Sequence, residues 1–489
     1  MEIKLENIGL IKDSTIRLDG LTVITGENNS GKTTVGKAIY ALVEGVSDLA
    51  ERAQRDQFHF INTTLEYIDD LFEPFILSSH HTKYTDMVFS NMPMLRHLVI
   101  SNWGYTRRFP ESFDSKQFAR ELHKELTAFS IDSIDFHSMY FKENWRISTK
   151  YKDEEEIKTG FQETVQEAIT TLGKMFEVNE RDPELIDYAR SSINETLNVE
   201  FHEQIQPVLY DVEKSRMEVS DNGAMMFSFD IVGNKIVKSD TPIFFGIPYK
   251  RALFVDNPLL LDSTPVIITR QSPFLQSPVD DSYFNKTRIL RHEDKLRSLL
   301  RTPTNATVLE KLLAEEKYAE INQKISEVIS GNIEMSADGD FYIVKGKRLH
   351  FTNLATGSKM FSILKILIDK GQIDERTLLV LDEPEAHLHP EWQNKFAEVI
   401  VLLVKYLKTN VVLTSHSPNF VMAIDAYMRK YEITDKTNFY QTRRMEDGFV
   451  EYVDVNDDLG QIYTDFMNGY SEVKELRDYY LDSGDCNDD

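Results

Sequence analysis

The chain has 489 residues, of which 41% are hydrophobic, and its formal net charge is −25 at pH 7. This length exceeds that of a typical single domain, and the hydrophobic content can support a large core. No apolar run is long enough to cross a membrane, and the charged N-terminus does not have the pattern of a signal peptide. We therefore expect a cytoplasmic protein without a membrane-spanning segment. The excess of Asp and Glu over Lys and Arg also argues against nonspecific nucleic-acid binding, which depends on Lys and Arg.

The first motif is a glycine-rich loop between a predicted strand and a predicted helix. Residues 21–24 form an apolar, β-branched run, and a helical pattern continues from residue 34. The loop fits the P-loop pattern, in which backbone N–H groups and a helix N-terminus surround the phosphates of a nucleotide. Lys32 adds a positive charge near the β- and γ-phosphates, and Thr33 offers a hydroxyl to Mg²⁺. The predicted nucleotide-binding residues in this loop are Gly26, Asn28, Asn29, Ser30, Gly31, Lys32, Thr33 and Thr34.

A second apolar run, residues 377–381, predicts a strand that is buried on both faces and leads directly to two acidic residues. Because ligands bind at the C-terminal edge of parallel strands, we expect these acidic residues beside the P-loop. We assign Asp382 to Mg²⁺ coordination and Glu383 to polarising the water that attacks the γ-phosphate. The alternative is an acidic turn after an ordinary core strand. The joint presence of the apolar run, the acidic pair and the P-loop disfavours it.

Two further segments are less specific by themselves. His416 follows the predicted strand 411–414 and can contact the γ-phosphate as a catalytic residue, although a histidine in such a place is more often a surface residue. The small-residue loop 353–359 precedes an apolar helix, so it exposes a helix N-terminus to which an anion can bind. An ordinary helix N-terminus capped by Thr356 or Ser358 is the alternative.

In this order, the motifs resemble those of the ABC-type ATPase heads of SMC-like proteins and of the overcoming-lysogenization-defect (OLD) family. The loop resembles their signature motif, with Gly357 and Ser358 as the best-matched positions, and residues 385–390 read Glu-Ala-His-Leu-His-Pro as in the OLD-like branch. Lys12 stands where the family often places a cation near the nucleotide. The resemblance implies an α/β fold, namely an ABC-type P-loop ATPase head with a mixed sheet flanked by helices.

The resemblance also implies a mechanism in which two heads face each other. Each ATP, with its Mg²⁺, is held between the P-loop of one subunit and the signature loop of the other, so hydrolysis weakens the closed dimer. We therefore expect a homodimer or a higher homo-oligomer. The family uses a glutamine as a further Mg²⁺ ligand. Gln271, after the predicted strand 266–269, is the better candidate, whereas Asp256 or Asn257 follows the predicted strand 253–255.

Long segments without a catalytic pattern separate the motifs of this one nucleotide site. We expect a largely helical insertion and no long coiled coil, because no heptad repeat is sustained. A basic cluster within residues 286–301 is interpreted as a solvated helix face, and the aromatic group at 103–109 as packed core. The expected segments are the ATPase head at 1–44, the helical insertion at 45–207, antiparallel strands of the head at 208–280, a helical arm at 281–330 and the head again at 331–489.

The expected function is that of an ATP-hydrolysing sensor or scaffold in a bacterial antiphage defence complex. Such a protein would resemble Septu-type and related OLD-like ATPases and would control a separate effector, a nuclease or a toxin. The alternative is an SMC-like DNA repair or recombination ATPase that clamps DNA directly. A self-contained OLD nuclease is disfavoured because only about seventy residues follow His416, fewer than a nuclease domain needs. A transporter motor ranks last because of the long insertion and the segment 385–390.

Overall fold

The structure is a computed structural model that describes residues 1–47, 49–75, 91–101, 114–130, 151–180, 185–237, 247–262, 291–302, 318–336 and 339–484. The chain divides into two compact units, each with a hydrophobic core. The predicted strand 266–269 and the aromatic group at 103–109 lie outside the described residues. The first unit, here called the head, comprises Met1–Ser47, Ala189–Ile268 and Ile289–Asp489, and the second, here called the insertion, comprises Asp48–Tyr188 and Thr269–Arg288.

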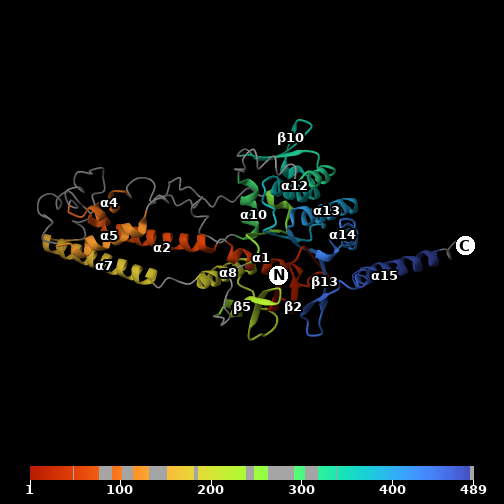
Figure 1. Ribbon diagram of the computed structural model, residues 1–489, viewed down its shortest axis with the longest axis horizontal. Coiled ribbons are helices and arrows are strands. Elements are labelled where there is room, and N and C mark those ends of the chain that lie inside the picture. The colour runs from red at the N-terminus through yellow and green to blue at the C-terminus, as the bar shows by residue number, and fades with distance from the viewer. Residues whose placement is uncertain are drawn as a thin grey trace. The chain divides into compact units, whose positions relative to one another are not determined.

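The head is built on a mixed sheet that has 11 strands among the described residues (Figure 1). Its part from β13 to β7 is parallel, and the part from β6 to β2 is antiparallel. This mixed sheet with flanking helices confirms the predicted α/β fold class. In spatial order, the strands are β6 (Lys235–Ile236), β5 (Ala224–Val232), β4 (Ser215–Asp221), β1 (Glu2–Ile8), β2 (Ile11–Arg17), β14 (Val450–Asp454), β13 (Thr437–Arg444), β3 (Leu21–Thr25), β12 (Asn410–Ser415), β11 (Thr377–Asp382) and β7 (Arg251–Val255).

The central parallel strands are buried on both faces, as their continuous apolar sequences predict. Every residue of β3 is buried, and in β11 only the last residue, Asp382, is partly exposed. Successive side chains of a strand point to opposite faces. Leu379 and Leu381 therefore pack into one core cluster, while Leu378 and Val380 pack into the other. The acidic residues that follow β11 thus emerge from a rigid, buried strand.

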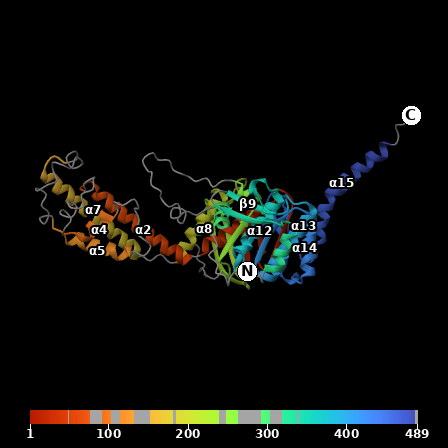
Figure 2. The same cartoon turned by 90° about the horizontal axis from the view of Figure 1, so that it is seen from above.

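Helices cover both faces of this sheet (Figure 2). One core cluster joins the strands to α10, α12, α13 and α14, and the other joins them to α1 and α8. Pro390 and Pro418 begin α13 and α14, positions where the missing N–H of proline costs no helical hydrogen bond. The helices of the head are α1 (Lys32–Val46), α8 (Leu185–Phe201, whose first residues belong to the insertion), α10 (His292–Arg301), α12 (Thr356–Asp369), α13 (Pro390–Leu402), α14 (Pro418–Lys430) and α15 (Gly460–Gly484).

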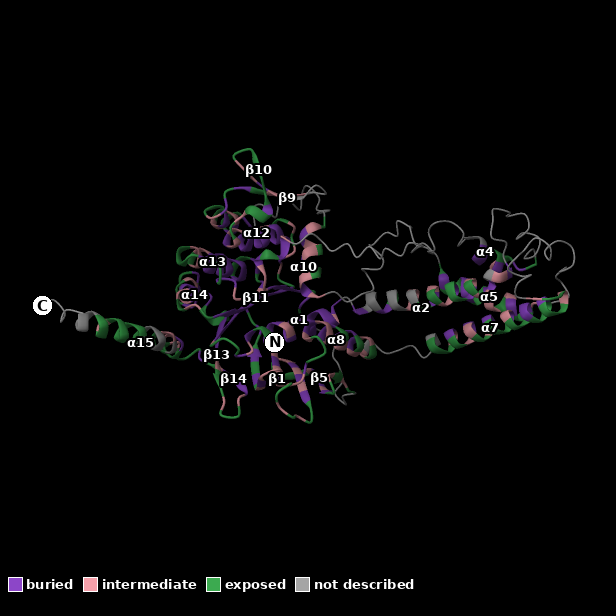
Figure 3. Cartoon of the chain, turned by 180° about the vertical axis from the view of Figure 1, so that it is seen from behind, coloured by how far each residue is buried: buried purple, intermediate pink, exposed green. Residues whose placement is uncertain are grey.

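Smaller elements complete the head. A separate three-stranded sheet has β9 as its central strand. The helix α15 is largely exposed along its described side chains (Figure 3). These elements are β8 (Asn332–Ser336), β9 (Gly339–Val344), β10 (Lys347–His350), the 3₁₀ turns η3 (Pro258–Leu261), η4 (Phe351–Asn353) and η6 (Thr434–Lys436), and the π-helical turn η5 (Leu403–Leu407).

The insertion is helical throughout its described elements and has its own core. The helices α2 and α7 contact each other and both contact α5, while α4 packs on α2 and α5. Buried Phe72 and Phe161 meet edge to face, with their ring centroids 5.6 Å apart. The insertion contains α2 (Leu49–Phe72), η1 (Glu73–Phe75), α4 (Pro93–Ser101), α5 (Ser115–Ala128) and α7 (Glu154–Glu180).

Among the described residues of the chain, none of the helices combines the length and the apolar character that a bilayer span requires.

Gly45, near the end of α1, marks a close approach between α1 and α8. A Cβ atom at Gly45 would lie only 2.7 Å from the Cα atom of Ile193 and 3.0 Å from its backbone nitrogen. Backbone atoms cannot rotate away as a flexible side chain can. An alanine at position 45 would therefore push the two helices apart.

We predict that Gly45→Ala destabilises the head by about 1–3 kcal/mol, the usual cost of overpacking. In α7, a Cβ atom at Gly173 would have no neighbour within 4 Å. The matched variant Gly173→Ala should therefore stabilise the insertion by about 0.5–1 kcal/mol, because alanine loses less backbone entropy. Urea unfolding of both variants measures the two free energies. A Gly45→Ala protein as stable as the wild type would contradict the close packing of α1 on α8.

Candidate nucleotide site

The P-loop lies at the C-terminal edge of the parallel strands, between β3 and α1. Its backbone turns through left-handed conformations, with φ of 59° at Asn29 and 76° at Gly31. Gly26 has φ of 150°, and a Cβ atom there would lie 1.7 Å from Oγ1 of Thr442. The hydroxyl of Tyr452, from β14, donates a hydrogen bond of 2.8 Å to the carbonyl of Gly31. The loop is therefore shaped by its glycines and held by the β13–β14 hairpin.

Lys32 begins α1 and folds back over the loop. Its Nζ donates hydrogen bonds to the carbonyl oxygens of Gly26, at 3.1 Å, and Glu27, at 2.7 Å. The side chain is 4% exposed, and Nζ lies 3.7 Å from Oε1 of Glu383. Its positive charge is thus fixed inside the loop, where phosphate oxygens would replace carbonyl oxygens as its partners.

Thr33 and Asp382, the two predicted Mg²⁺ ligands, are brought together by the fold. Thr33 Oγ1 donates a hydrogen bond of 2.6 Å to Oδ2 of Asp382, and Thr414 Oγ1, from β12, donates one of 2.5 Å to Oδ1. Burial raises the pKa of Asp382, although these two hydroxyl donors lower it, and the nearby carboxylates of Glu383 and Asp256 raise it further. A hydroxyl and a carboxylate are the oxygen ligands that Mg²⁺ prefers. The residues present therefore fit this ion.

Glu383 lies close to Lys32 and His416, the two other residues that the sequence analysis placed beside the γ-phosphate. Its Oε1 is 3.3 Å from Nδ1 of His416 and 3.7 Å from Nζ of Lys32. Its backbone is left-handed, with φ of 47°, which is unusual for a residue with a side chain. The backbone N–H of Glu383 donates to Thr414, 3.0 Å from Oγ1 and 3.2 Å from the carbonyl oxygen. This anchoring holds the strained residue with its carboxylate toward Lys32 and His416.

Glu385 is a structural partner of the site that sequence reasoning treated only as part of a family motif. It is 1% exposed, and its Oε1 accepts hydrogen bonds from Ser415 Oγ at 2.5 Å and from the backbone N–H of His416 at 3.2 Å. Burial raises the pKa of this carboxyl, although these donors lower it. Glu385 therefore ties the loop after β11 to the end of β12 and positions His416. The sequence shows only that Glu385 stands two residues after Glu383, and this spacing does not predict that the Glu385 side chain is buried.

The signature-like loop forms the first turn of α12, and its predicted residues have different surroundings. Gly357 is buried, and a Cβ atom there would lie 2.9 Å from Cδ2 of Leu388. Ser358 is partly exposed. Ala355 occupies the N-cap position, and no side chain in the described part of the chain caps this helix. The alternative of a helix capped by Thr356 or Ser358 is therefore wrong.

Lys359, next in the loop, is buried and bonded to internal partners. Its Nζ donates to Oδ2 of Asp262 at 2.6 Å and to the carbonyl oxygen of Thr352 at 3.1 Å. Lys12 is partly exposed. Its Nζ lies 2.9 Å from Oδ2 of Asp447 and 4.4 Å from the ring centroid of Phe449, both on the β13–β14 hairpin.

The glutamine ligand stays a prediction, since Gln271 lies outside the described residues. The two alternatives, Asp256 and Asn257, belong to the described residues. Asp256 follows β7, the strand next to β11, and its charge acts on Asp382. Asn257 instead accepts a hydrogen bond from the N–H of Leu259 and caps η3.

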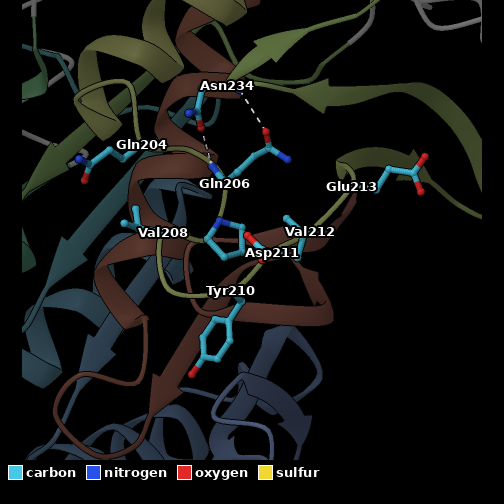
Figure 4. Close-up of a pocket in the computed structure, with 9 residues that line it drawn as sticks. Gln204, Gln206, Val208, Tyr210, Asp211, Val212, Glu213 and Asn234 are labelled. Atoms are coloured by element: carbon cyan, nitrogen blue, oxygen red, sulfur yellow. Dashed lines mark hydrogen bonds between the residues drawn. The ribbon is translucent and has the colours of Figure 1, made fainter.

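A pocket of about 620 Å³ lies away from these residues, on the segment after α8 (Figure 4). Two of its lining residues, Gln206 and Asn234, are bonded to each other. The backbone N–H of each donates to the side-chain oxygen of the other, at 2.8 Å from Gln206 and at 3.1 Å from Asn234. None of the predicted nucleotide-binding residues lines it, so it is distinct from the candidate site. Its lining comprises Gln204, Gln206, Pro207, Val208, Tyr210, Asp211, Val212, Glu213 and Asn234.

The raised pKa of Glu385 predicts a pH-dependent difference between the wild type and Glu385→Gln. Because the folded pKa lies above the unfolded value of 4.5, this group's stabilising contribution is complete below that value and is lost as pH rises through the folded pKa. The neutral glutamine does not lose it. We therefore expect Glu385→Gln to have the higher free energy of unfolding at pH 7–8, with the difference shrinking toward pH 4.5.

Urea unfolding across this pH range measures the difference. The control is Glu391→Gln, which removes a carboxylate with a 69% exposed side chain at the start of α13 and so measures the effect of losing one solvated negative charge. A difference that stays constant with pH would show that Glu385 is not held at a raised pKa.

Comparison with known proteins gives one family match. The model of the AAA_15 family, described as AAA ATPase domain, matches residues 1–421 and so spans the P-loop, Asp382, Glu383 and His416. A search among curated proteins returns no significant match.

Solved structures similar to this chain include SMC heads. The SMC head domain from Thermotoga maritima is 11% identical, with a TM-score of 0.35, and the match covers 93% of this chain and 98% of that one. An SMC head domain with an extended coiled coil, bound to the C-terminal domain of ScpA and derived from Pyrococcus furiosus, is also 11% identical, with a TM-score of 0.31 and coverage of 97% and 98%. From the family match, the chain belongs to the AAA_15 family of AAA ATPase domains.

Proposed function

We propose that this ATPase binds ATP with Mg²⁺ at the P-loop and hydrolyses it to ADP and phosphate. The observation that carries the proposal is that Oε1 of Glu383 lies within 3.7 Å of both Lys32 and His416. The same sheet edge holds the Thr33–Asp382 pair. Phosphoryl transfer needs positioning and charge stabilisation more than covalent chemistry. Such a cluster beside a P-loop meets both needs.

Each residue has a role that follows from its position. The P-loop N–H groups and Lys32 bind the phosphate oxygens, while Thr33 and Asp382 hold Mg²⁺, which neutralises charge on the phosphates when it is bound. Glu383 accepts a hydrogen bond from the attacking water and draws its proton toward Oε1. His416, held by Glu385, contacts the γ-phosphate and orients Glu383 from the other side.

We further propose that the ATP is shared between two copies of the chain. The N-terminus of α12 supports this arrangement, because its first backbone N–H groups lack an intrahelical partner and no described side chain caps them. The small side chain of Ser358, which is partly exposed, leaves room for a phosphate at this end, whereas Gly357 is buried against Leu388. The γ-phosphate of a partner's ATP would supply the missing acceptor and join the two heads into a homodimer or a higher homo-oligomer.

The cellular role we propose is that of a sensor or scaffold in a cytoplasmic bacterial antiphage defence complex, with a separate protein as the effector. The resemblance of residues 385–390 to the OLD-like branch supports this role, as does the net charge of −25, which disfavours direct clamping of DNA. Tight, salt-sensitive binding of duplex DNA by the chain alone would favour the repair alternative instead.

We predict that Glu383→Gln retains ATP binding but lowers the turnover of ATP by about 10²–10⁴-fold, the usual contribution of a positioned general base. The amide cannot accept the proton of the attacking water, yet it leaves the phosphate-binding residues intact. Phosphate release and equilibrium binding of ATP measure the two effects, and light scattering follows the dimer that ATP should trap.

The matched control is Glu391→Gln, an exposed glutamate a few residues along the chain, which should turn over ATP at the wild-type rate. Unchanged turnover in Glu383→Gln would assign the reaction to another residue.

Sharing of ATP between copies predicts complementation between two inactive variants. Ser358→Arg should block the α12 N-terminus without touching its own P-loop. In a mixed dimer with Glu383→Gln, one of the two sites combines an intact P-loop and Glu383 from one chain with an intact α12 from the other. Mixing equal amounts before ATP is added should therefore restore about a quarter of the wild-type turnover, as expected for an isologous dimer.

Turnover is measured for each variant alone and for the mixture. If Ser358→Arg alone is as active as the wild type, or the mixture is no more active than its parts, each site works within a single copy.

A further inference from the structure

A second group of polar residues lies where the ends of α8 and β7 meet the start of α10. Its centre is His292, the first residue of α10, which is 1% exposed. Glu200, near the end of α8, is completely buried and binds His292 twice, through Nδ1 at 2.6 Å and through the backbone N–H at 2.8 Å. These two contacts fix both the position of the ring and the orientation of its Nδ1 edge.

The other ring nitrogen, Nε2, faces a different carboxylate. It lies 3.1 Å from Oδ2 of Asp256, yet among the described residues it has no hydrogen-bond partner of acceptable geometry. The ring cannot turn away, because it packs on Phe254 at a centroid distance of 4.4 Å and meets the edge of Tyr40 at 5.9 Å. This buried nitrogen therefore lies within ion-pair distance of a carboxylate but makes no well-aligned hydrogen bond to it.

Glu293 completes the group. One ligand atom from each of Asp256, His292 and Glu293 lies within 4.8 Å of the others. The side chains of Asp256 and Glu293 are 25% and 30% exposed, which leaves a route from solvent. Glu200 has the position of the carboxylate that commonly accepts the second N–H of a metal-bound histidine. The arrangement has three candidate ligands and the partner that orients the buried one.

We propose that Asp256, His292 and Glu293 form a second cation site, which binds a divalent transition metal ion such as Mn²⁺ or Zn²⁺ independently of the nucleotide's Mg²⁺. The imidazole nitrogen favours these ions over Mg²⁺ and Ca²⁺, which prefer oxygen ligands. The two carboxylates balance the charge of the ion. The site joins the ends of α8 and β7 to α10, and the charge of Asp256 acts on Asp382 in the nucleotide site.

A proton on Nε2 is the competing occupant. Burial alone lowers the pKa of His292, but the two neighbouring carboxylates outweigh it and raise the pKa to about 9. Within the described part of the chain, other charged groups near the site include Arg291, which lies 3.8 Å from Glu293, and Lys295, which pairs with Glu44 one turn further along α10. A metal ion must therefore displace the proton, so direct measurement of metal binding decides between the two occupants.

The test is calorimetric titration of MnCl₂ into chelator-treated, full-length protein without nucleotide. We expect one equivalent of Mn²⁺ to bind the wild type and also Asp382→Asn, in which the nucleotide-site carboxylate is removed. Glu293→Gln should weaken this binding at least tenfold. Glu200→Gln keeps an oxygen acceptor but replaces the carboxylate that orients the ring, and it should weaken the binding about 10–100-fold.

The matched control is Asp294→Asn. It makes the same change of charge in the same turn of α10, but Asp294 is paired with Arg297 at 2.8 Å outside the group, so Mn²⁺ binding should not change. Far-ultraviolet circular dichroism confirms that each variant is folded, and Glu293 is exposed enough to be replaced without loss of the fold.

Two results would overturn the proposal. One is an absence of Mn²⁺ binding to the wild type, in which case His292 holds a proton between two carboxylates. The other is binding that disappears in Asp382→Asn but persists in Glu293→Gln, which would place the ion at the nucleotide site. Because no nucleotide is present, neither result bears on ATP hydrolysis.

Discussion

The hydrogen bond from Thr33 to Asp382 joins residues that are 349 positions apart, and the candidate site depends on it. It can form only because β12 lies between β3 and β11, with all three strands parallel and ending at one edge. Thr414, at the end of β12, bonds to both Asp382 and Glu383 and so sets the spacing between the neighbouring strand ends. The buried apolar strands make this edge rigid, since a shift in register would move their side chains to the opposite faces.

Buried charge organises the region around that edge. Lys32, Lys359 and Glu385 are each less than 5% exposed, and each is bonded to a neighbour that fixes its position. Burying a charge costs free energy unless it is paired or hydrogen-bonded, so such groups hold loops in a single conformation. In the proposed function, phosphate oxygens would replace the carbonyl partners of Lys32 when a nucleotide binds. Lys359 and Glu385 instead keep internal partners, and their role is to position the α12 N-terminus and His416.

The proposed second cation site also uses a carboxylate at the C-terminal end of a parallel strand, here β7, which is the neighbour of β11. Asp256 directly follows β7, and Asp382 is the last residue of β11. The two carboxylates are close enough for the charge of Asp256 to raise the pKa of Asp382. A metal ion bound to Asp256 would reduce that repulsion. His292 and Glu200 belong to helices that border the insertion in sequence. The site connects those helices to the nucleotide edge through the Glu200–His292 hydrogen bond and the 3.1 Å contact between His292 and Asp256.

The sequence alone determined the local parts of this protein. The P-loop, the buried strand before Asp382 and the α/β class followed from short patterns, because glycine positions and apolar runs constrain the backbone wherever they occur. Only the tertiary structure decided which distant groups meet: Glu385 with Ser415, His292 with Glu200 and Asp256, and Lys359 with Asp262. It also decided that Ala355, rather than Thr356 or Ser358, stands at the N-cap of α12. Burial and pairing across long sequence separations depend on how strands and helices pack, and no single segment encodes that packing.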